Sequence, residues 1–253
     1  MLAAGLLAAA LVAACAQRVS GRPVRPISTG FPTTSAQLAA LLVKGTKSIK
    51  TAELSLSVTT AGRSITAFGQ ETIEDGKVKD VAFIETIPDF GALNLVIKDG
   101  KYYAQLPPAQ RSSGKAWLLV RPGSSSNVVR TLYKYLRNSQ SSASLGSGAA
   151  FARATTRLMF LGSPTLDGVA TGHYALAVQM SRLPRAYPGK AALRSAGVTR
   201  IPAEIWVDGQ GRPRLVTEQL TVGATPVYTE VRLRQFDAPV SITAPPRDQV
   251  STD

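Results

Sequence analysis

Short segments in which apolar and polar residues alternate recur along this chain, and several are joined by Asp-Gly pairs. Leu54, Leu56 and Val58 alternate with polar residues, and Asp75-Gly76 and Asp99-Gly100 separate later segments. A period of two is typical of a strand with one buried face, and Asp-Gly between such segments favours a tight hairpin. Because hairpins join neighbouring strands, the pattern predicts an antiparallel meander.

The alternation predicts about nine strands in two groups, before and after a basic middle segment. Further turns are expected at Ala61-Gly62, Asp167-Gly168, Asp208-Gly209 and Gly223-Ala224. Asp208-Gly209 resembles a calcium loop only superficially, because the acidic ligands that should follow are absent. The predicted strands cover residues 54–58, 64–73, 78–87, 93–97, 102–106, 174–180, 203–207, 214–222 and 227–236.

Three segments place apolar residues at helical spacing instead. The first follows Ser35 as its N-cap and ends before Gly45, and the others cover residues 128–137 and 149–161. A Ser/Gly-rich loop at 139–148 separates the last two, and residues 190–196 are a candidate short helix. An apolar sheet face needs a partner, which amphipathic helices supply. The sequence therefore predicts a single α+β domain over residues 35–247.

The first fourteen residues are uncharged and mostly apolar, and they precede the only cysteine, Cys15. Val12-Ala13-Ala14-Cys15 has the form of a lipobox, so residues 1–14 look like a bacterial lipoprotein signal peptide. Its cleavage would leave a Cys15 that carries diacylglycerol, with acyl chains such as palmitate. The alternative is an ordinary secretory signal with a chance cysteine. The positively charged start of such signals is missing, which leaves open a start further upstream.

The ends of the expected domain are polar. Residues 15–34 contain the lipidated Cys15 and a segment rich in Pro, Ser and Thr, which predicts a flexible tether. Residues 248–253 are predicted to form a polar tail. With one cysteine, the chain cannot use an internal disulfide, so its stability must come from apolar burial. We expect a protein held at the extracytoplasmic face of the cell membrane.

The positive charge is concentrated in one segment. The chain has a formal net charge of +13, and residues 111–200 hold thirteen basic residues against Asp167 alone. An exported, tethered protein seldom meets nucleic acid, so an anionic membrane surface or wall polymer is the expected partner. A merely solvated basic surface is the alternative. Arg130, Lys134, Arg153 and Arg157 are the residues expected to face a lipid headgroup or the membrane.

The chain offers little catalytic chemistry. His173 is its only histidine, Cys15 its only cysteine, and no nucleophile elbow, phosphate loop or dinucleotide motif is present. Zinc sites need several His or Cys ligands. We therefore predict no enzyme, no metal site and no cofactor. A hydrolase that uses His173 is the weakest of the hypotheses.

Several motifs together resemble a known family. They are the lipobox, the tether, the helix before a meander, Ile205-Trp206-Val207-Asp208-Gly209-Gln210-Gly211-Arg212-Pro213-Arg214, and Phe236-Asp237-Ala238-Pro239-Val240 with Pro245-Pro246. In this order they are similar to the actinobacterial lipoproteins LppX, LprA, LprF and LprG. The resemblance implies a fold like that of the lipoprotein carrier LolA. That fold is a strongly curved antiparallel sheet, or half-barrel, packed on several helices around an apolar cavity.

The resemblance also implies a function, because relatives bind acylated lipids or lipoglycans and help deliver them to the outer envelope. We expect a membrane-anchored carrier of amphiphilic lipid, and an envelope lipid transporter is a further candidate partner. A non-catalytic scaffold that binds a protein or an anionic wall polymer through its basic face is the alternative. The residues expected to line the acyl chains are Leu54, Leu56, Val58, Leu95, Ile97, Leu132, Leu158, Leu176 and Val178.

Overall fold

The computed structural model describes residues 30–252, apart from 89–90, 106, 109–110, 112–113, 128, 131, 135, 137–145, 186 and 188. The predicted signal peptide, Cys15 and most of the predicted tether lie outside the described residues. Among the described residues, no helix has the length and hydropathy needed to cross a bilayer.

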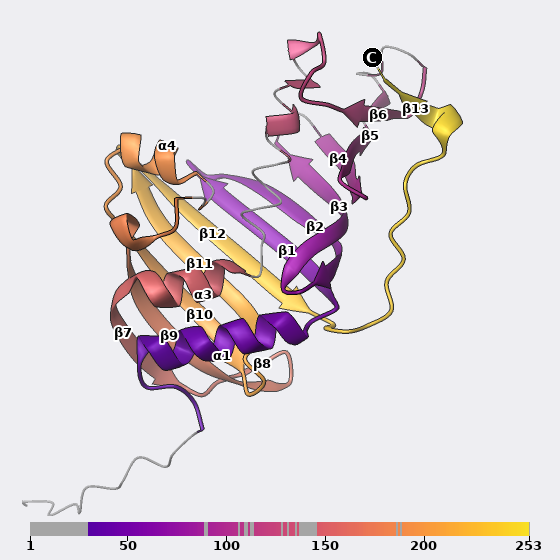
Figure 1. Ribbon diagram of the computed structural model, residues 1–253. Helices are drawn as coiled ribbons and strands as arrows, with labels where there is room; N and C mark the ends of the chain where they lie inside the picture. The colour runs from indigo at the N-terminus through magenta and orange to yellow at the C-terminus, as the bar shows by residue number, and fades with distance from the viewer. Residues whose placement is uncertain are drawn as a thin grey trace, which may run out of the picture.

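A large curved sheet that does not close on itself forms the body of the protein (Figure 1). Its strands follow the order β13-β6-β5-β4-β3-β2-β1-β12-β11-β10-β9-β7, with β8 paired to β9. All pairs are antiparallel except β13 with β6. The strands are β1 (Thr51–Thr60), β2 (Arg63–Glu74), β3 (Lys77–Ile87), β4 (Gly91–Lys98), β5 (Lys101–Gln105), β6 (Trp117–Val120), β7 (Thr155–Gly162), β8 (Thr165–Leu166), β9 (Val169–Gln179), β10 (Arg200–Asp208), β11 (Pro213–Val222), β12 (Thr225–Arg234) and β13 (Val250–Ser251).

Few helices accompany this sheet. In the described part of the chain they include α1 (Ser35–Ser48), α3 (Gly146–Ala154), α4 (Lys190–Ser195) and the short 3-10 turns η2 (Met180–Arg182) and η3 (Arg247–Gln249). Residues 127, 129–130, 132–134 and 136 are also helical, and we call them the second helical segment. The predicted fold class, a curved antiparallel sheet packed on helices, is confirmed.

The first helix begins one residue earlier than predicted. Thr34, rather than Ser35, is the N-cap, because its Oγ1 accepts a hydrogen bond from the backbone N–H of Gln37 at 3.2 Å. The Gln37 side chain accepts in turn from the backbone N–H of Thr34, which completes a capping box. The helix also continues through Gly45 to Ser48.

The prediction of one helix over residues 149–161 is wrong. The helix α3 ends at Ala154, and Thr155–Gly162 forms β7, paired with β9. Two β-branched residues begin this strand, and the hydroxyls of Thr155 and Thr156 both donate to the carbonyl of Ala177 at 3.1 Å. The predicted 139–148 loop also ends early, because residues 146–148 already belong to α3.

The two faces of the sheet have different covers. We call the side that packs on α1 and α3 the helix face, and the opposite side the open face. α1 and α3 lie together across β9, β10 and β11 (Figure 1). The second helical segment covers the helix face of β4–β6, where Val129 and Leu136 pack on Leu93 and Leu95.

The C-terminal chain returns across the open face of the strands at the other end of the sheet (Figure 1). Ile242 packs with Val96 and Tyr103 in a small hydrophobic cluster. Val250 then pairs with Trp117 in β6. Part of the segment that the sequence predicts as a polar tail is therefore a strand of the sheet.

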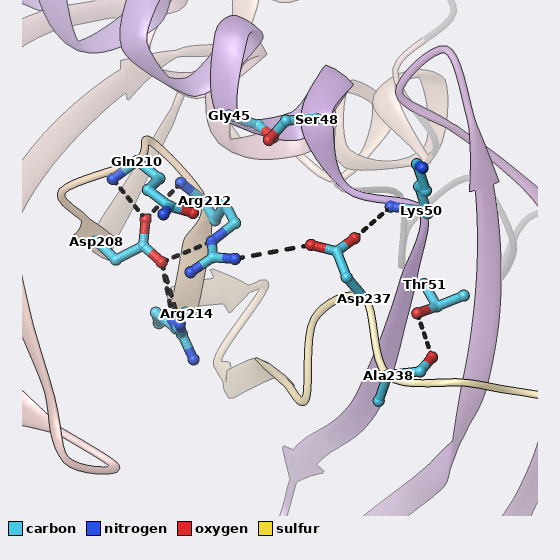
Figure 2. Close-up of polar contacts among 10 residues, drawn as sticks. All are labelled: Gly45, Ser48, Lys50, Thr51, Asp208, Gln210, Arg212, Arg214, Asp237 and Ala238. Carbon is cyan, nitrogen blue, oxygen red and sulfur yellow. Dashed lines mark hydrogen bonds and ion pairs between the residues drawn. The ribbon is translucent and has the colours of Figure 1, made fainter.

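A buried ion pair network fixes the β10–β11 hairpin next to α1 (Figure 2). Asp208, 2% exposed, accepts hydrogen bonds from Nε of Arg212 at 2.8 Å and Nη2 of Arg214 at 3.1 Å. Arg212 lies 3.9 Å from Asp237, whose Oδ1 accepts from the backbone N–H of Lys50 at 2.8 Å. The network therefore ties this hairpin to the ends of α1 and β12.

The hairpin also touches the backbone of α1 directly. A Cβ added to Gly211, which has φ +84°, would lie 2.2 Å from the carbonyl oxygen of Leu41. A Cβ on Gly45 would lie 2.1 Å from the backbone of Gly211. Both glycines are needed because only a backbone without side chains permits this approach. The contact holds α1 against one side of the sheet.

Candidate functional site

A stripe of partly exposed apolar side chains runs along the helix face of the central strands β12, β1 and β2. Leu56 pairs with Val231 on one side and with Ala67 on the other, and Val58 pairs with Ile65. Paired residues point to the same face of an antiparallel sheet. We define the central stripe as these half-buried residues: Leu56, Val58, Ile65, Val227 and Val231.

Hydrophobic clusters close the helix face on both sides of the central stripe. Tyr174, Val178 and Ile201 are 0% exposed beneath α1 and α3 on one side. On the other side, Leu93 and Leu95 are 2% and 1% exposed beneath the second helical segment. Neither Leu56 nor Val58 belongs to a hydrophobic cluster among the described residues. The central stripe is therefore an apolar floor between two covered flanks.

Three carboxyl groups lie on the same face around the central stripe. Glu85 follows Leu56 and Ala67 in one cross-strand row, and Glu218 pairs with Thr229, which pairs with Val58. Glu71 pairs with Ala52 of β1 and is 1% exposed. Three acids on an apolar face are unusual, because the burial of a charge without a partner is costly.

Burial makes these carboxyl groups harder to ionise, so all three keep protons at a higher pH than an exposed glutamate does. It raises the pKa of Glu71 to about 8, and it raises the pKa values of Glu85 and Glu218 to about 7. Both carboxyl oxygens of Glu71 lack a hydrogen-bond partner within the part of the chain that the structure describes. A neutral carboxyl group can donate one hydrogen bond and accept others, so these groups can bind polar atoms of a ligand.

These three acids are not among the predicted site residues, although the sequence carries a signal for them. Each stands where the alternation requires an apolar residue. Glu71 lies two residues before Ile73, at the same phase of the alternation. Glu85 lies two residues from both Phe83 and Ile87, again at the apolar phase. Glu218 lies between Val216 and Leu220. An acid at the buried phase of a strand is a functional candidate.

The nine residues predicted to line acyl chains all lie on the helix face or pack against it, but in different surroundings. Leu176 and Val178 belong to the cluster under α1 and α3, and Leu158 of β7 packs against it. Leu95 and Leu132 belong to or pack on the cluster under the second helical segment. Leu54 lies in a small cluster near the end of α1, Ile97 is 2% exposed, and Leu56 and Val58 form part of the central stripe.

The four predicted basic contacts are not brought together. Arg130 and Lys134 belong to the second helical segment, and Arg130 donates to the carbonyl of Ser124 at 2.6 Å. Arg153 is exposed at the end of α3, and Arg157 is exposed on β7 instead of a helix. Arg130 and Lys134 therefore lie over one half of the sheet, and Arg153 and Arg157 lie over the other. The central strands separate β4–β6 from β7.

A pocket of about 610 Å³ lies on the open face of β7, β9, β10, β11 and β12. Arg157 and Met159 of β7 border it, as do Arg200 and Trp206 of β10 and Tyr228 of β12. Beneath its edge, His173 stacks on Trp206 with ring centroids 3.9 Å apart. The pocket faces away from the central stripe, so it is a separate feature.

Two contacts fix the position of His173 on the open face. Its Nε2 lies 2.8 Å from a carboxylate oxygen of Glu204, and its ring stacks on Trp206. Among the residues that the structure describes, no group of His, Cys, Asp and Glu has the arrangement of a metal site.

Comparisons with known proteins agree with this architecture. No model of a protein family matches the chain, and no curated protein matches its sequence. The fold is similar to that of LprF from Mycobacterium bovis, with a TM-score of 0.57 and 14% identity over 83% of this chain and 96% of that chain. The Mycobacterium tuberculosis lipoprotein LppX gives a TM-score of 0.50 and 13% identity, over 81% of this chain and 98% of that chain. The predicted resemblance to these lipoproteins is confirmed at the level of the fold.

Proposed function

We propose that this protein, which shares the fold of LprF and LppX, binds an amphiphilic lipid or lipoglycan on the helix face of its sheet. It carries or presents that lipid in the cell envelope. The observation that carries the proposal is the central stripe, where Leu56, Val58 and Ile65 stay half-buried between two covered flanks. Such a floor has the chemistry that an acyl chain needs.

The driving force is the removal of apolar surface from water. Each methylene that the central stripe buries contributes about 0.8 kcal/mol, so affinity should rise with acyl length. The flanking clusters are already full, since Val178 and Leu95 are 0% and 1% exposed. We therefore assign the acyl chains to the central stripe, and we assign a supporting role to most of the other predicted lining residues.

The carboxyl groups provide polar contacts for a ligand that is not purely hydrocarbon. Glu85 and Glu218 flank Leu56 and Val58 in their cross-strand rows. When protonated, they can donate hydrogen bonds to ester carbonyls or sugar hydroxyls at the linkage between acyl chains and headgroup. Their pKa values of about 7 place a change of charge near neutral pH.

The location that fits this role is the extracytoplasmic face of the cell membrane, with diacylglycerol on Cys15. Two or three acyl chains on one residue hold a domain durably in a bilayer. We propose no catalytic reaction, metal or cofactor for this protein. Its chemistry is the reversible burial of lipid, and an envelope lipid transporter is a candidate partner.

Native mass spectrometry of the full chain, extracted gently from membranes of producing cells, tests the proposal. We expect masses that exceed the acylated protein by one amphiphilic lipid. The double variant Leu56→Gln, Val58→Gln should lose most of this lipid, because polar side chains replace the floor of the site. Protein that never carries copurifying lipid contradicts the proposal.

A matched control uses the opposite face of the same part of the sheet. Phe68 and Ile84 form a cross-strand pair on the open face, and they are 52% and 50% exposed. The variant Phe68→Gln, Ile84→Gln also removes two large apolar side chains, but it leaves the central stripe intact. It should retain its lipid, with a thermal unfolding midpoint close to that of the wild type.

The alternative is a scaffold that binds a protein or an anionic wall polymer. The exposed pair of Phe68 and Ile84 favours this alternative, because apolar residues exposed together can mark an interaction surface. Crosslinking in cells separates the two functions. A specific crosslinked partner that the Phe68→Gln, Ile84→Gln variant loses, together with an absence of bound lipid, would support the scaffold.

A further inference from the structure

We infer that the sheet edge formed by β7, together with the adjoining open-face pocket, docks on the surface of an anionic lipid bilayer. The residues that enter the bilayer interface are Met159 and Leu161, and Arg157 and Arg200 contact lipid phosphates. Phe160 lies between them at the same edge and packs on Tyr174 and Phe31. The inference rests on the proposed attachment to a membrane, but it does not depend on lipid being carried on the helix face.

The first observation is the exposure of β7. Met159, Phe160 and Leu161 follow one another in sequence and are 47%, 39% and 43% exposed. β7 is the last strand in the order of the sheet, with β9 as its only neighbour among the described strands. Long apolar side chains on an edge strand invite association unless something covers them. An interfacial layer of lipid is one such cover.

The second observation is the place where the N-terminal chain reaches the domain. Phe31 packs against Phe160 of β7, with ring centroids 6.4 Å apart. A Cβ on Gly172 of the neighbouring strand would touch Phe31 at 2.8 Å. The chain that leads back to Cys15 therefore begins beside the exposed apolar edge. Residues 16–29 span at most about 50 Å, so a lipid on Cys15 limits how far this edge can move from the bilayer.

The third observation is charge. Arg157 and Arg200 border the pocket of about 610 Å³, and their backbones belong to β7 and β10. No residue in the described part of the chain forms an ion pair with either guanidinium group. The acid in this pocket, Glu204, already lies 2.8 Å from His173. Basic residues near a charged membrane surface contribute about 1 kcal/mol each. The two arginines are thus placed to receive phosphate groups.

The aromatic residues of the pocket suit the same surroundings. Trp206 and Tyr228 line the open face beside Met159. Such rings have an apolar body and a polar edge, and they are favoured where one end of a site is apolar and the other is wet. Arg130 and Lys134, which the sequence also predicts as membrane contacts, lie over the other half of the sheet. The docking surface is therefore an edge strand rather than a basic helical face.

Depth-dependent quenching tests the inference on the full acylated chain purified from membranes. Acylation blocks the thiol of Cys15, so Leu161→Cys provides a free thiol for an environment-sensitive dye. The protein is reconstituted in vesicles of equal amounts of phosphatidylglycerol and phosphatidylcholine. We expect a blue shift of the emission and strong quenching by lipids that carry a nitroxide near the headgroup.

The control label replaces Thr66, an exposed residue on the open face of β2. The strands β1, β12, β11, β10 and β9 separate β2 from β7. Dye at this position should show neither the shift nor the quenching. A second control takes the wild-type chain through the same labelling reaction, and any dye that it acquires has reacted with Cys15. Equal quenching at both positions, or none at Leu161→Cys, overturns the proposed docking.

The charge contribution is measured at the salt concentration where the wild-type domain is half docked. Arg157→Gln and Arg200→Gln, each in the labelled chain, should lower the ratio of docked to free domain about fivefold. The matched variant Lys101→Gln removes an exposed charge from β5 and should leave the ratio unchanged. A chain that does not float with vesicles overturns anchorage and docking together. A chain that floats with an unquenched label overturns docking alone.

Discussion

Two parts of the helix face are built from the same alternating pattern, yet one is a filled core and the other remains partly open. Beneath α1 and α3, Val178 and Ile201 are 0% exposed. On the central strands, Leu56 and Val58 keep partial exposure although they alternate in the same way. The difference teaches that alternation defines an apolar face, whereas the helices decide which part of that face becomes core.

The largest expected effect comes from breaking the network that holds α1 over the filled part. Asp208→Asn removes the buried carboxylate that Arg212 and Arg214 share. We expect the free energy of unfolding, measured in urea, to fall by about 3–5 kcal/mol, because two cations lose their partner. Asp167→Asn is the control, since its pair with Arg232 is exposed and long at 3.5 Å. It should cost less than about 1 kcal/mol.

A matched pair of leucines compares the two parts of the face directly. Leu176→Ala, at 3% exposure, should lower the free energy of unfolding by about 2–5 kcal/mol and leave lipid binding intact. Leu56→Ala should cost less than about 1.5 kcal/mol and weaken lipid binding, because a half-buried side chain loses little on truncation. Urea unfolding and native mass spectrometry give the two readouts. Equal losses of stability would contradict the distinction.

The buried carboxyl groups should make stability depend on pH. Burial raises the pKa of Glu71 from 4.5 to about 8, so the folded protein binds more protons than the unfolded chain between these values. Stability should therefore fall as pH rises from about 4.5 to about 8. Glu71→Gln should make this decline shallower and stabilise the protein at pH above 8, as urea midpoints would reveal. Part of the decline should remain, because the pKa values of Glu85 and Glu218 are also raised, to about 7. Glu74→Gln, at an exposed residue of the same strand, should leave the decline unchanged.

The smallest effect is expected on the open face. His173→Ala removes the pair with Glu204 and the stack on Trp206. Because Glu204 is 44% exposed, we expect a loss of about 1 kcal/mol or less in urea and no change in lipid content. A hydrolytic activity that this variant abolishes would revive the hypothesis of a hydrolase.

The strands were largely predictable from the sequence because their alternation and Asp-Gly turns are local signals. The run Leu158-Met159-Phe160-Leu161 was not, since four apolar residues in a row fit a helix or a strand equally. Its pairing with β9 decided the outcome. The short strand β13 was missed because it exists only by pairing with β6, far away in sequence.

The candidate site was predictable only in part. The sequence placed Leu56, Val58 and Leu176 on one apolar face, and the register confirms that they share it. The sequence did not distinguish the filled clusters from the central stripe, because that distinction depends on where α1, α3 and the second helical segment pack. It also grouped Arg153 and Arg157 on one helix, which the change to β7 at Thr155 separates.

The sequence by itself determined the alternating strands, their hairpin turns and the first helix. These follow from side-chain periodicity and turn-forming residues, which act over a few residues. Only the tertiary structure decided that Glu71, Glu85 and Glu218 face an apolar stripe, and that β7 forms an exposed edge beside Phe31. The reason is that burial and proximity depend on strand register and helix packing between segments far apart in the chain.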